Sequence, residues 1–284
     1  MTITRAIFAV TTYNRRAYLR ECLESWAATR DPAWSWLVIV ADDGSTDGTL
    51  DDLQALRLPA DCVVLRNDRR GAGGQTNAIY DYCRRLDYAL AFKADDDLVF
   101  RAKGWDRLYR RAMAASGFDH LCHLNLRLWN QERRPAVPLN VAKPLAVDRS
   151  GAAAAYTDVY NCMGCLFTFT PSLLDAVGDV DERNFPVRGD WHIDYSARAA
   201  RAGFNRVATF FDARNSNDFI DLQNNLKPTY LHSIAPQSPA MQRVAAPAEV
   251  ERRQAIVRDE RRVLVRMERA KAGVSVEAPA RQRP

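Results

Sequence analysis

The stretch WSWLVIVADDGSTDGT, residues 34–49, joins a continuous apolar run to an acidic cluster rich in turn-forming residues. A short apolar run bounded by turn residues is typical of a strand that is buried on both faces. We expect this strand over Trp36–Ala41, with the polar cluster DDGSTD at its carboxyl end. The segment TLDDLQAL (49–56) then has the composition of a short helix. Strand, turn and helix in this order predict an α/β protein.

The same order recurs along the first 100 residues. Further strands are expected at AIFAV (6–10), CVVLRND (62–68) and YALAFKADDD (88–97). A segment with helical spacing follows the first of these, and a Gly-rich loop that runs into a helix, GAGGQTNAIYDYCRRL (71–86), follows the second. Nearly all-apolar strands that alternate with helices indicate a mostly parallel sheet with helices on both faces. Ligands of such sheets bind beyond the carboxyl ends of the strands, where the clusters TTYN, DDGSTD and DDD fall.

Beyond residue 100 the pattern is less regular. Helices are expected over 104–116, from Pro171 onward and over 189–204, and strands over 120–129 and just before Pro171. The Pro- and Ala-rich segment 133–155 is expected to be a loop, and the last eleven residues, VSVEAPARQRP, are expected to be disordered. The tail from Pro247 to Gly273 is charged and predicted to be helical. Its one apolar face needs a partner, so we expect it to pack on the rest of the chain or on a second subunit as a homodimer.

Composition excludes several classes of protein. The chain has 284 residues, 47% of them hydrophobic and 26% charged, which is ordinary for a soluble globular protein. The net charge of +5 weakly favours an anionic ligand and is no nucleic-acid signature by itself. No apolar run is long enough for a transmembrane segment or a secretion signal, so we expect a cytoplasmic protein. The six cysteines are expected to be reduced thiols, since CMGC (162–165) has no second cysteine pair for zinc.

Residues 91–100, AFKADDDLVF, place three carboxylates between two apolar runs. Adjacent carboxylates repel each other and are costly to bury unpaired, so Asp95, Asp96 and Asp97 need a reason to stand there. Mg²⁺ and Mn²⁺ prefer oxygen ligands and often bridge one or two carboxylates to substrate phosphates. An acidic, solvated turn is the alternative. The apolar runs on both sides favour a divalent-cation site.

These motifs together resemble the family-2 glycosyltransferases, whose nucleotide-diphospho-sugar transferase fold is called GT-A. The resemblance covers roughly residues 5–205 and is carried by four stretches, FAVTTYNRRAYLRECLESW, VIVADDGSTDGT, NDRRGAGGQTNAI and FKADDDLVF, the last in the place of the Asp-x-Asp (DXD) motif. It implies an α/β, Rossmann-like fold with a mostly parallel central sheet flanked by helices. It further implies a GT-A domain over 1–235, with a nucleotide-sugar half (1–100) and an acceptor half (101–235). Residues 236–284 would form a charged helical extension and a tail.

The resemblance implies a metal-dependent, inverting transferase that uses a nucleotide-diphospho-sugar, above all a UDP-sugar. Asp42 or Asp43 would accept a hydrogen bond from the N–H of a uracil-type base. The residues implied in donor binding are Thr11, Thr12, Asn14, Arg15, Asp42, Asp43, Ser45, Gln75, Asn77, Lys93, Asp95 and Asp96. Asp95, Asp97 and a late histidine, His232, would hold Mn²⁺ or Mg²⁺. Many relatives carry an Arg just before the helix Asn, where this chain reads Gln75-Thr76-Asn77, so Arg69, Arg70 or Lys93 would contact the phosphates instead.

The stretch RGDWHIDYSARAARAGF (188–204) resembles the segment that supplies the general base in this family. Asp194 matches the position of an Asp in the family segment that is structural or binds the acceptor. When the two segments are aligned on this Asp, His192 stands at the position of the general base. We favour Asp190, two residues upstream, because it is a carboxylate, with His192 second and a simple helix cap as the alternative for Asp190. Four residues are expected in the acceptor pocket, with core packing as the alternative for the tryptophan: Asp181, Glu182, Phe185 and Trp191.

Other activities are compatible with the same fold. A nucleotidyltransferase that makes sugar nucleotides would carry a Gly-rich basic signature after the first strand, and VTTYNRRAY lacks the glycines. A non-catalytic binding protein would have a decayed site, whereas DDGSTD and DDD are intact. The acceptor is expected to be a glycan or another hydroxyl compound, with modified nucleic acid as a minor alternative.

Overall fold

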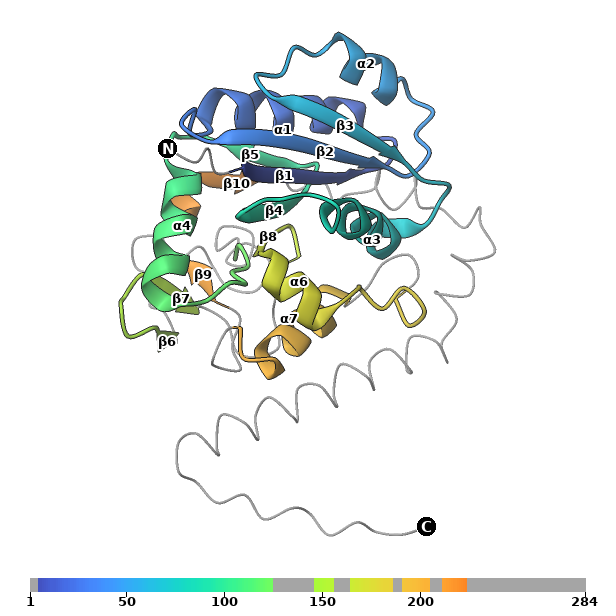
Figure 1. The fold of residues 1–284 in the computed structure, drawn as a ribbon. Coiled ribbons are helices and arrows are strands. Elements are labelled where there is room, and N and C mark those ends of the chain that lie inside the picture. The colour runs from blue at the N-terminus through green and yellow to red at the C-terminus, as the bar shows by residue number, and fades with distance from the viewer. Residues whose placement is uncertain (1–4, 125–145, 156–163, 186–190, 205–210, 224–284) are drawn as a thin grey trace, which may run out of the picture.

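The computed structural model describes residues 5–124, 146–155, 164–185, 191–204 and 211–223. Its centre is a five-stranded sheet with the strand order β3-β2-β1-β4-β8 (Figure 1). The strands are β1 (Arg5–Thr12), β2 (Ser35–Asp42), β3 (Asp61–Arg66), β4 (Leu90–Asp95) and β8 (Leu166–Phe169). β1 to β4 are parallel, and β8 is antiparallel to β4. The predicted mostly parallel sheet is therefore confirmed.

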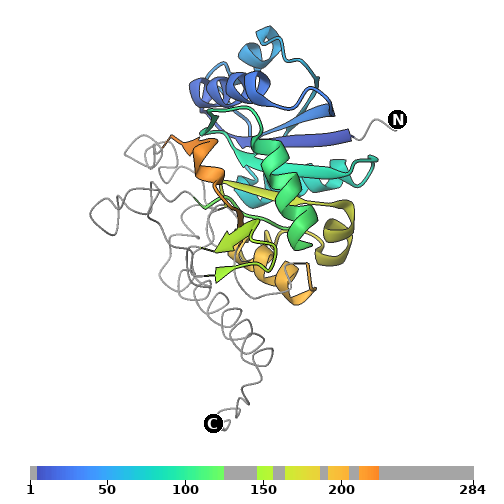
Figure 2. The ribbon, with the colours of Figure 1, turned by 90° about the vertical axis from the view of Figure 1, so that its left-hand side faces the viewer.

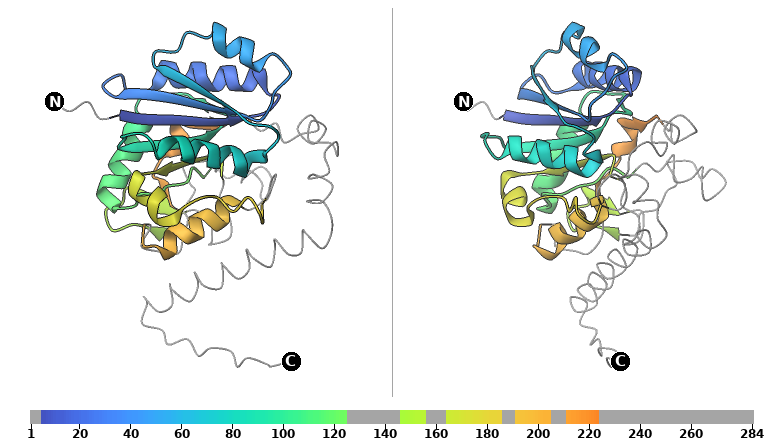
Figure 3. Two further views of the ribbon diagram at one scale, coloured as in Figure 1. Left: turned by 45° about the vertical axis from the view of Figure 1, so that its right-hand side comes forward. Right: turned by 90° about the vertical axis from the view of Figure 1, so that its right-hand side faces the viewer.

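Helices cover both faces of this sheet. They are α1 (Arg16–Thr29), α2 (Thr49–Ala55), α3 (Gly71–Cys83), α4 (Trp105–Ser116), α6 (Pro171–Val177) and α7 (Trp191–Arg201). Successive side chains of β1 point to opposite faces, so Phe8 packs in the core with α1 and α4 while Ile7 packs in the core with α3, α6 and α7. Figure 2 shows α4 in front of the strands, and Figure 3 shows α1 and α3 on opposite sides of the sheet.

Aromatic side chains anchor the segments on both sides of the acidic triplet. Phe92 lies in β4, and Phe100 lies in β5 (Leu98–Phe100), which follows the triplet directly. Both rings are buried against Trp105, at centroid distances of 4.9 Å for Phe92 and 4.4 Å for Phe100. β5 pairs antiparallel with β10 (Ile220–Leu222). The triplet is thus a turn between two core strands, as its apolar flanks predicted.

Backbone hydrogen bonds fix the position of this turn. The N–H of Asp95 donates to the carbonyl of Cys165 at 2.7 Å, just before β8. The carbonyl of Asp97 accepts from the N–H of Gln223 at 2.8 Å, just after β10. Two segments from much later in the chain therefore hold the triplet from two sides.

Two predicted loops are wrong in part. The segment 133–155, expected to be a loop, contributes β6 (Ala146–Val147) and β7 (Ala153–Ala155), which form a small sheet with β9 (Asp212–Ala213). The Gly-rich segment is the first turn of α3, which begins at Gly71 itself. Its glycines serve close packing, because a Cβ on Gly74 would lie 2.5 Å from the Cβ of Arg70.

Other expectations fall partly or wholly outside the described residues. The expected strand 120–129 is described only to residue 124, where Cys122 forms an isolated bridge with Phe167. His232, Asp190 and the C-terminal extension lie outside the described ranges, so the domain division and the homodimer stay predictions. The five cysteines within the described ranges are free thiols, four of them buried. No helix in the described part of the chain has the length and apolar character needed to span a membrane.

Candidate active site

Polar side chains gather where β2, β1 and β4 end side by side. The strand register places Thr12 opposite Asp42 and Thr11 opposite Asp95. The three polar clusters that follow these strands in sequence therefore meet at one edge of the sheet. This edge is the site that the sequence predicted for a ligand.

The structure separates the roles of the two adjacent aspartates after β2. Both carboxylate oxygens of Asp43 accept backbone N–H groups at the start of α3, from Arg70 at 2.7 Å and from Gly71 at 2.9 Å. Asp42 uses Oδ2 to accept the N–H groups of Gly44 and Ser45 at 3.2 and 3.0 Å. Its Oδ1 is buried and has no hydrogen-bond partner among the described residues. Asp42 therefore keeps an acceptor for a ligand, whereas Asp43 supports the helix.

The β1–α1 turn is joined to the loop after β2. Asn14 has a left-handed backbone conformation, with φ of 50°, which is uncommon for a residue other than glycine. Its N–H donates to the Ser45 hydroxyl at 2.8 Å, and its side-chain oxygen accepts the N–H of Thr46 at 2.8 Å. These bonds use Asn14 and Ser45 to hold the two loops together at the rim of the site.

Thr12 connects three parts of the site. Its N–H donates to Oε1 of Gln75 on α3 at 3.0 Å, and its hydroxyl donates to Oδ2 of Asp96 at 2.7 Å. Thr11, the residue before it, is buried in β1. Because α3, β1 and the triplet share these bonds, a shift of one element would disturb the other two.

The acidic triplet is partly neutralised by two basic side chains. The guanidinium of Arg15 lies 2.9 Å from Asp96 Oδ1 and 2.8 Å from Asp97 Oδ2. Lys93 is fully buried and pairs with Asp95, with its Nζ 5.2 Å from the ring centre of Trp191. Burial raises the pKa of Asp96 to about 7, against the opposing effect of Arg15, and it raises the pKa of Asp97 as well. Further positive charge at this point would therefore be favourable.

The triplet fits a cation that is shared with a ligand. Oδ1 of Asp97 is buried and has no hydrogen-bond partner among the described residues, and the side chain of Asp95 is 39% exposed. No group of three or more His, Cys, Asp or Glu side chains within the described ranges could hold a metal by itself. Mg²⁺-type sites commonly combine one or two carboxylates with substrate phosphates and water. The donor set fits that type of site better than an all-protein cage.

Three of the four residues expected in the acceptor pocket, Asp181, Glu182 and Phe185, lie in the loop 178–185 that follows α6. The side chain of Asn77 on α3 is hydrogen-bonded to this loop: it accepts the N–H of Val180 at 2.7 Å and donates to Glu182 at 2.7 Å. Glu182 also pairs with Arg70 at 2.6 Å, and Phe185 is fully buried in the core. Asp181 accepts the N–H of Asn184 at 3.0 Å. Their described contacts stabilise this loop, and their roles toward substrates stay predictions.

Helix α7 begins beside the triplet. Trp191 is 4% exposed and packs on Phe167 as well as on Lys93. His192 is half-buried, and a Cβ on Gly164 would lie only 2.7 Å from its Cγ, so a larger residue at 164 would displace the imidazole. Glycine is needed there for that close approach.

Asp194 faces a different environment from the start of the helix. It pairs with Arg198 at 3.0 Å, and Arg198 also donates to the carbonyl oxygens of Val177 and Asp179 at 2.7 and 2.8 Å. Burial raises the pKa of Asp194, with Arg198 acting in the opposite direction. This arrangement supports a structural role, which ties α7 to the end of α6.

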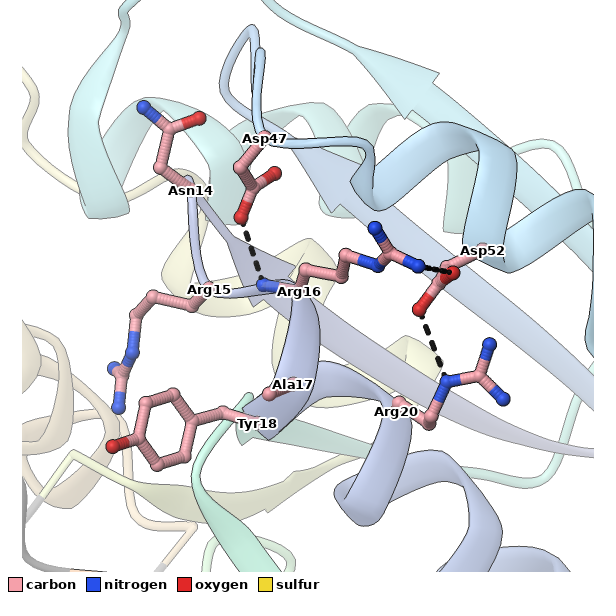
Figure 4. A pocket seen from close by; sticks show the side chains of 8 residues that line it. All are labelled: Asn14, Arg15, Arg16, Ala17, Tyr18, Arg20, Asp47 and Asp52. Atoms are coloured by element: carbon pink, nitrogen blue, oxygen red, sulfur yellow. Dashed lines mark hydrogen bonds and ion pairs between the residues drawn. The ribbon is translucent and has the colours of Figure 1, made fainter.

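Figure 4 shows an open pocket of about 460 Å³ next to this site, at the start of α1. It shares Asn14 and Arg15 with the site. Asp52 in its lining binds both Arg16 and Arg20, at 2.6 and 3.0 Å, and Asp47 accepts the backbone N–H of Arg16 at 3.0 Å. The acidic triplet is not part of its lining.

Sequence reasoning missed two features near the site. The guanidinium of Arg69, at a φ of 57°, lies 3.6 Å from the ring centre of Tyr13, the residue that follows β1. Because Tyr13 belongs to the TTYN cluster, its position at the sheet edge could be predicted from the sequence. Its stacking on Arg69 could not. A buried network was also missed. Asp212 accepts from Tyr109 at 2.7 Å and from Ser216, and His123 lies 3.0 Å from Ser216.

Comparisons with known proteins agree with this fold. Residues 8–121 match glycosyl transferase family 2. Among solved structures, S. aureus TarS 1-349 in complex with UDP-GlcNAc is 20% identical with a TM-score of 0.50, over 70% of this chain and 54% of that one. The mannosyltransferase PcManGT from Pyrobaculum calidifontis, in complex with GDP-Man and Mn²⁺, is 17% identical with a TM-score of 0.55, over 96% of this chain and 65% of that one. A search of curated proteins found no match.

The predicted resemblance is therefore confirmed: residues 8–121 are similar to glycosyl transferase family 2, and the solved structures share the GT-A fold. The chain spans about half the length of the TarS 1-349 structures that it matches. At these identities the solved structures support the fold, and the family match covers most of residues 1–100, the part of the chain predicted to bind the nucleotide-sugar.

Proposed function

We propose that this protein transfers a sugar from a UDP-sugar to a hydroxyl group of a glycan or another acceptor, with inversion at the anomeric carbon. The observation that carries the proposal is the pair of buried carboxylate oxygens at one sheet edge, Asp42 Oδ1 and Asp97 Oδ1, which have no partners among the described residues. One suits a base N–H and the other a cation shared with a diphosphate. The similarity to TarS with UDP-GlcNAc and to PcManGT with GDP-Man and Mn²⁺ supports this assignment.

Asp42 would recognise the base. Uracil presents an N–H at the position where cytosine has a bare ring nitrogen, so a carboxylate oxygen that is still able to accept favours uracil. The Gly44 and Ser45 N–H groups hold the other oxygen of Asp42 and so fix its orientation. The ring of Tyr13 lies at the same edge of the sheet.

The diphosphate needs positive charge. Of the three basic residues considered for it, Arg70 is paired with Glu182 and Lys93 with Asp95. Arg69 has no ion pair within the described residues, and it is held on the Tyr13 ring. We assign the phosphate contact to Arg69. Asp95 and Asp97 would hold Mn²⁺ or Mg²⁺, which supplies charge neutralisation to the leaving diphosphate when bound.

Transfer requires a base at the acceptor. The acceptor hydroxyl gives its proton to the base, its oxygen bonds to the anomeric carbon, and the bond from that carbon to the diphosphate oxygen breaks, leaving UDP. Asp190 remains our first choice for this base and His192 the second. The start of α7 lies close to the triplet through Trp191 and Lys93, which supports a base from this helix turn.

A donor screen tests the proposal. Release of the nucleotide diphosphate would be measured over several UDP-, GDP- and CDP-sugars, with Mn²⁺ and with EDTA, for the unmodified protein and for Asp97→Ala. We expect release from at least one UDP-sugar that depends on Mn²⁺ and is lost in Asp97→Ala. Asp47→Ala, a change in the loop after β2 that leaves the triplet intact, is the matched control and should keep activity. The proposal is refuted if the protein binds neither UDP nor any other nucleotide diphosphate.

A further inference from the structure

Arg15 occupies the acidic triplet in a way that affects how a cation enters it. We infer that Arg15 competes with the divalent cation for Asp96 and Asp97, so that the triplet binds the cation well only together with the donor diphosphate. Arg15 is then a positioning residue that couples the two ligands. The inference rests on the proposed function for the identity of the second ligand.

The contacts of Arg15 use the oxygen atoms that a cation would need. One nitrogen of the guanidinium is 2.9 Å from Asp96 Oδ1 and the other is 2.8 Å from Asp97 Oδ2. The second oxygen of Asp96 accepts from the Thr12 hydroxyl at 2.7 Å. Of the four carboxylate oxygens, Asp97 Oδ1 is the one that has no partner among the described residues. A cation that takes a second oxygen from Asp96 or Asp97 must therefore displace Arg15 or the Thr12 hydroxyl.

The side chain of Arg15 is held in this position by its surroundings. Its side chain is 15% exposed, and the guanidinium lies 4.8 Å from the ring centre of Tyr18, one turn along α1. The turn that carries it is fixed by the bonds of Asn14 to Ser45 and Thr46. Figure 4 shows Arg15 directed toward Tyr18 while Arg16 is directed to the opposite side, toward Asp52.

Charge decides which ligands the triplet accepts. Arg15 and Lys93 together offset two of the three carboxylates, and a guanidinium keeps its charge at any physiological pH. A divalent cation alone thus meets one uncompensated negative charge and a nearby positive one, which repels it. A diphosphate brings at least two negative charges and its own oxygen ligands, and it also offers the displaced guanidinium a new partner. Cation and diphosphate therefore favour each other's binding.

A purely structural role for Arg15 has a different consequence. If Arg15 only neutralised the two carboxylates to stabilise the fold, its removal would lower stability, and the coupling between cation and nucleotide would stay the same. The affinity for a cation without nucleotide separates these two roles. Coupling between two ligands is reciprocal, so it can be measured from either side.

The experiment compares Arg15→Gln with Arg16→Gln, a matched control whose guanidinium pairs with Asp52 outside the triplet. Mn²⁺ affinity would be measured by titration calorimetry and water-proton relaxation, first without nucleotide and then with saturating UDP. We expect Mn²⁺ alone to bind at least about tenfold more tightly to Arg15→Gln than to the unmodified protein, because a like charge is removed. Arg16→Gln should match the unmodified protein. UDP should enhance Mn²⁺ binding less in Arg15→Gln than in the other two.

Equal or weaker Mn²⁺ binding in Arg15→Gln, with the fold retained by circular dichroism, would overturn the inference. If that variant does not fold, Arg15→Lys decides, because it keeps the charge but loses the contact of two guanidinium nitrogens with Asp96 and Asp97. Tighter binding of Mn²⁺ alone than in the unmodified protein supports the inference, and equal or weaker binding overturns it. Failure of the proposed function gives another pattern. UDP would then bind none of the three proteins, while the effect of Arg15→Gln on Mn²⁺ alone would persist.

Discussion

Replacing Asp42 by asparagine tests how the base of the donor is selected. The carbonyl oxygen of the new side chain should stay on the Gly44 and Ser45 N–H groups, because only an acceptor satisfies them. The amide nitrogen then takes the place of Oδ1, the buried oxygen that has no partner among the described residues. The uracil N–H would then face a hydrogen-bond donor, the amide nitrogen, in place of the carboxylate oxygen that would accept it in the unmodified protein.

The magnitude follows from the lost hydrogen bond. A hydrogen bond to a charged group contributes about 1.5–3 kcal/mol. Its loss corresponds to UDP binding that is roughly 10- to 150-fold weaker, at about 1.4 kcal/mol per factor of ten. CDP should lose less or gain, since the cytosine ring nitrogen accepts a hydrogen bond from the new amide. The ratio of UDP to CDP affinity is therefore the sensitive quantity.

Titration calorimetry with UDP and CDP on three proteins checks this prediction. Asp43→Asn is the matched control, because the Asp43 carboxylate accepts the Arg70 and Gly71 N–H groups at the start of α3. It should lower the free energy of unfolding by about 1 kcal/mol, as the loss of a helix cap does, and leave the UDP-to-CDP ratio unchanged. The reasoning is refuted if Asp42→Asn keeps the ratio of the unmodified protein, or if the ratio changes in Asp43→Asn instead.

Three further changes test other parts of the site. Arg69→Ala should raise the KM for the UDP-sugar by about tenfold through the loss of a phosphate contact, whereas Arg70→Ala should mainly lower thermal stability; equal KM values for the two variants would contradict the assignment. Asp190→Asn should keep UDP binding and slow transfer by roughly 10²–10⁴-fold at saturating donor, and a near-normal rate beside an inactive His192→Ala would give the role of the base to the histidine. Burial raises the pKa of Asp106 above its ordinary value of 3.8, so the folded state binds the proton more tightly, and the free energy of unfolding should fall as the pH rises through that raised pKa. Denaturant unfolding would be measured at a series of pH values from the ordinary pKa of Asp106 up to neutrality. The free energy of unfolding should fall less with pH in Asp106→Asn than in the unmodified protein, and an equal fall in the two proteins would contradict this prediction.

The strands and helices of residues 1–100 could be predicted from the local sequence pattern. The apolar runs predict strands that are buried on both faces, and β1 shows why, since Phe8 and Ile7 pack in cores on opposite sides of the sheet. The carboxyl-end position of the three polar clusters then follows from the parallel order of the strands. Chain connectivity alone carries that information, so the sheet edge and its acidic triplet were predictable from the sequence.

The roles of individual side chains at this edge were decided by tertiary contacts. Asp42 and Asp43 are adjacent and of the same residue type, but their contacts differ. Both oxygens of Asp43 accept N–H groups at the start of α3, whereas one oxygen of Asp42 has no partner among the described residues. Asp194 matches a family spacing and pairs with Arg198. Arg15, just past the end of β1, reaches a carboxylate of the triplet that lies 82 residues further along the chain. Sequence pattern records which residue types follow a strand, whereas the partner of each atom depends on segments that only folding brings together.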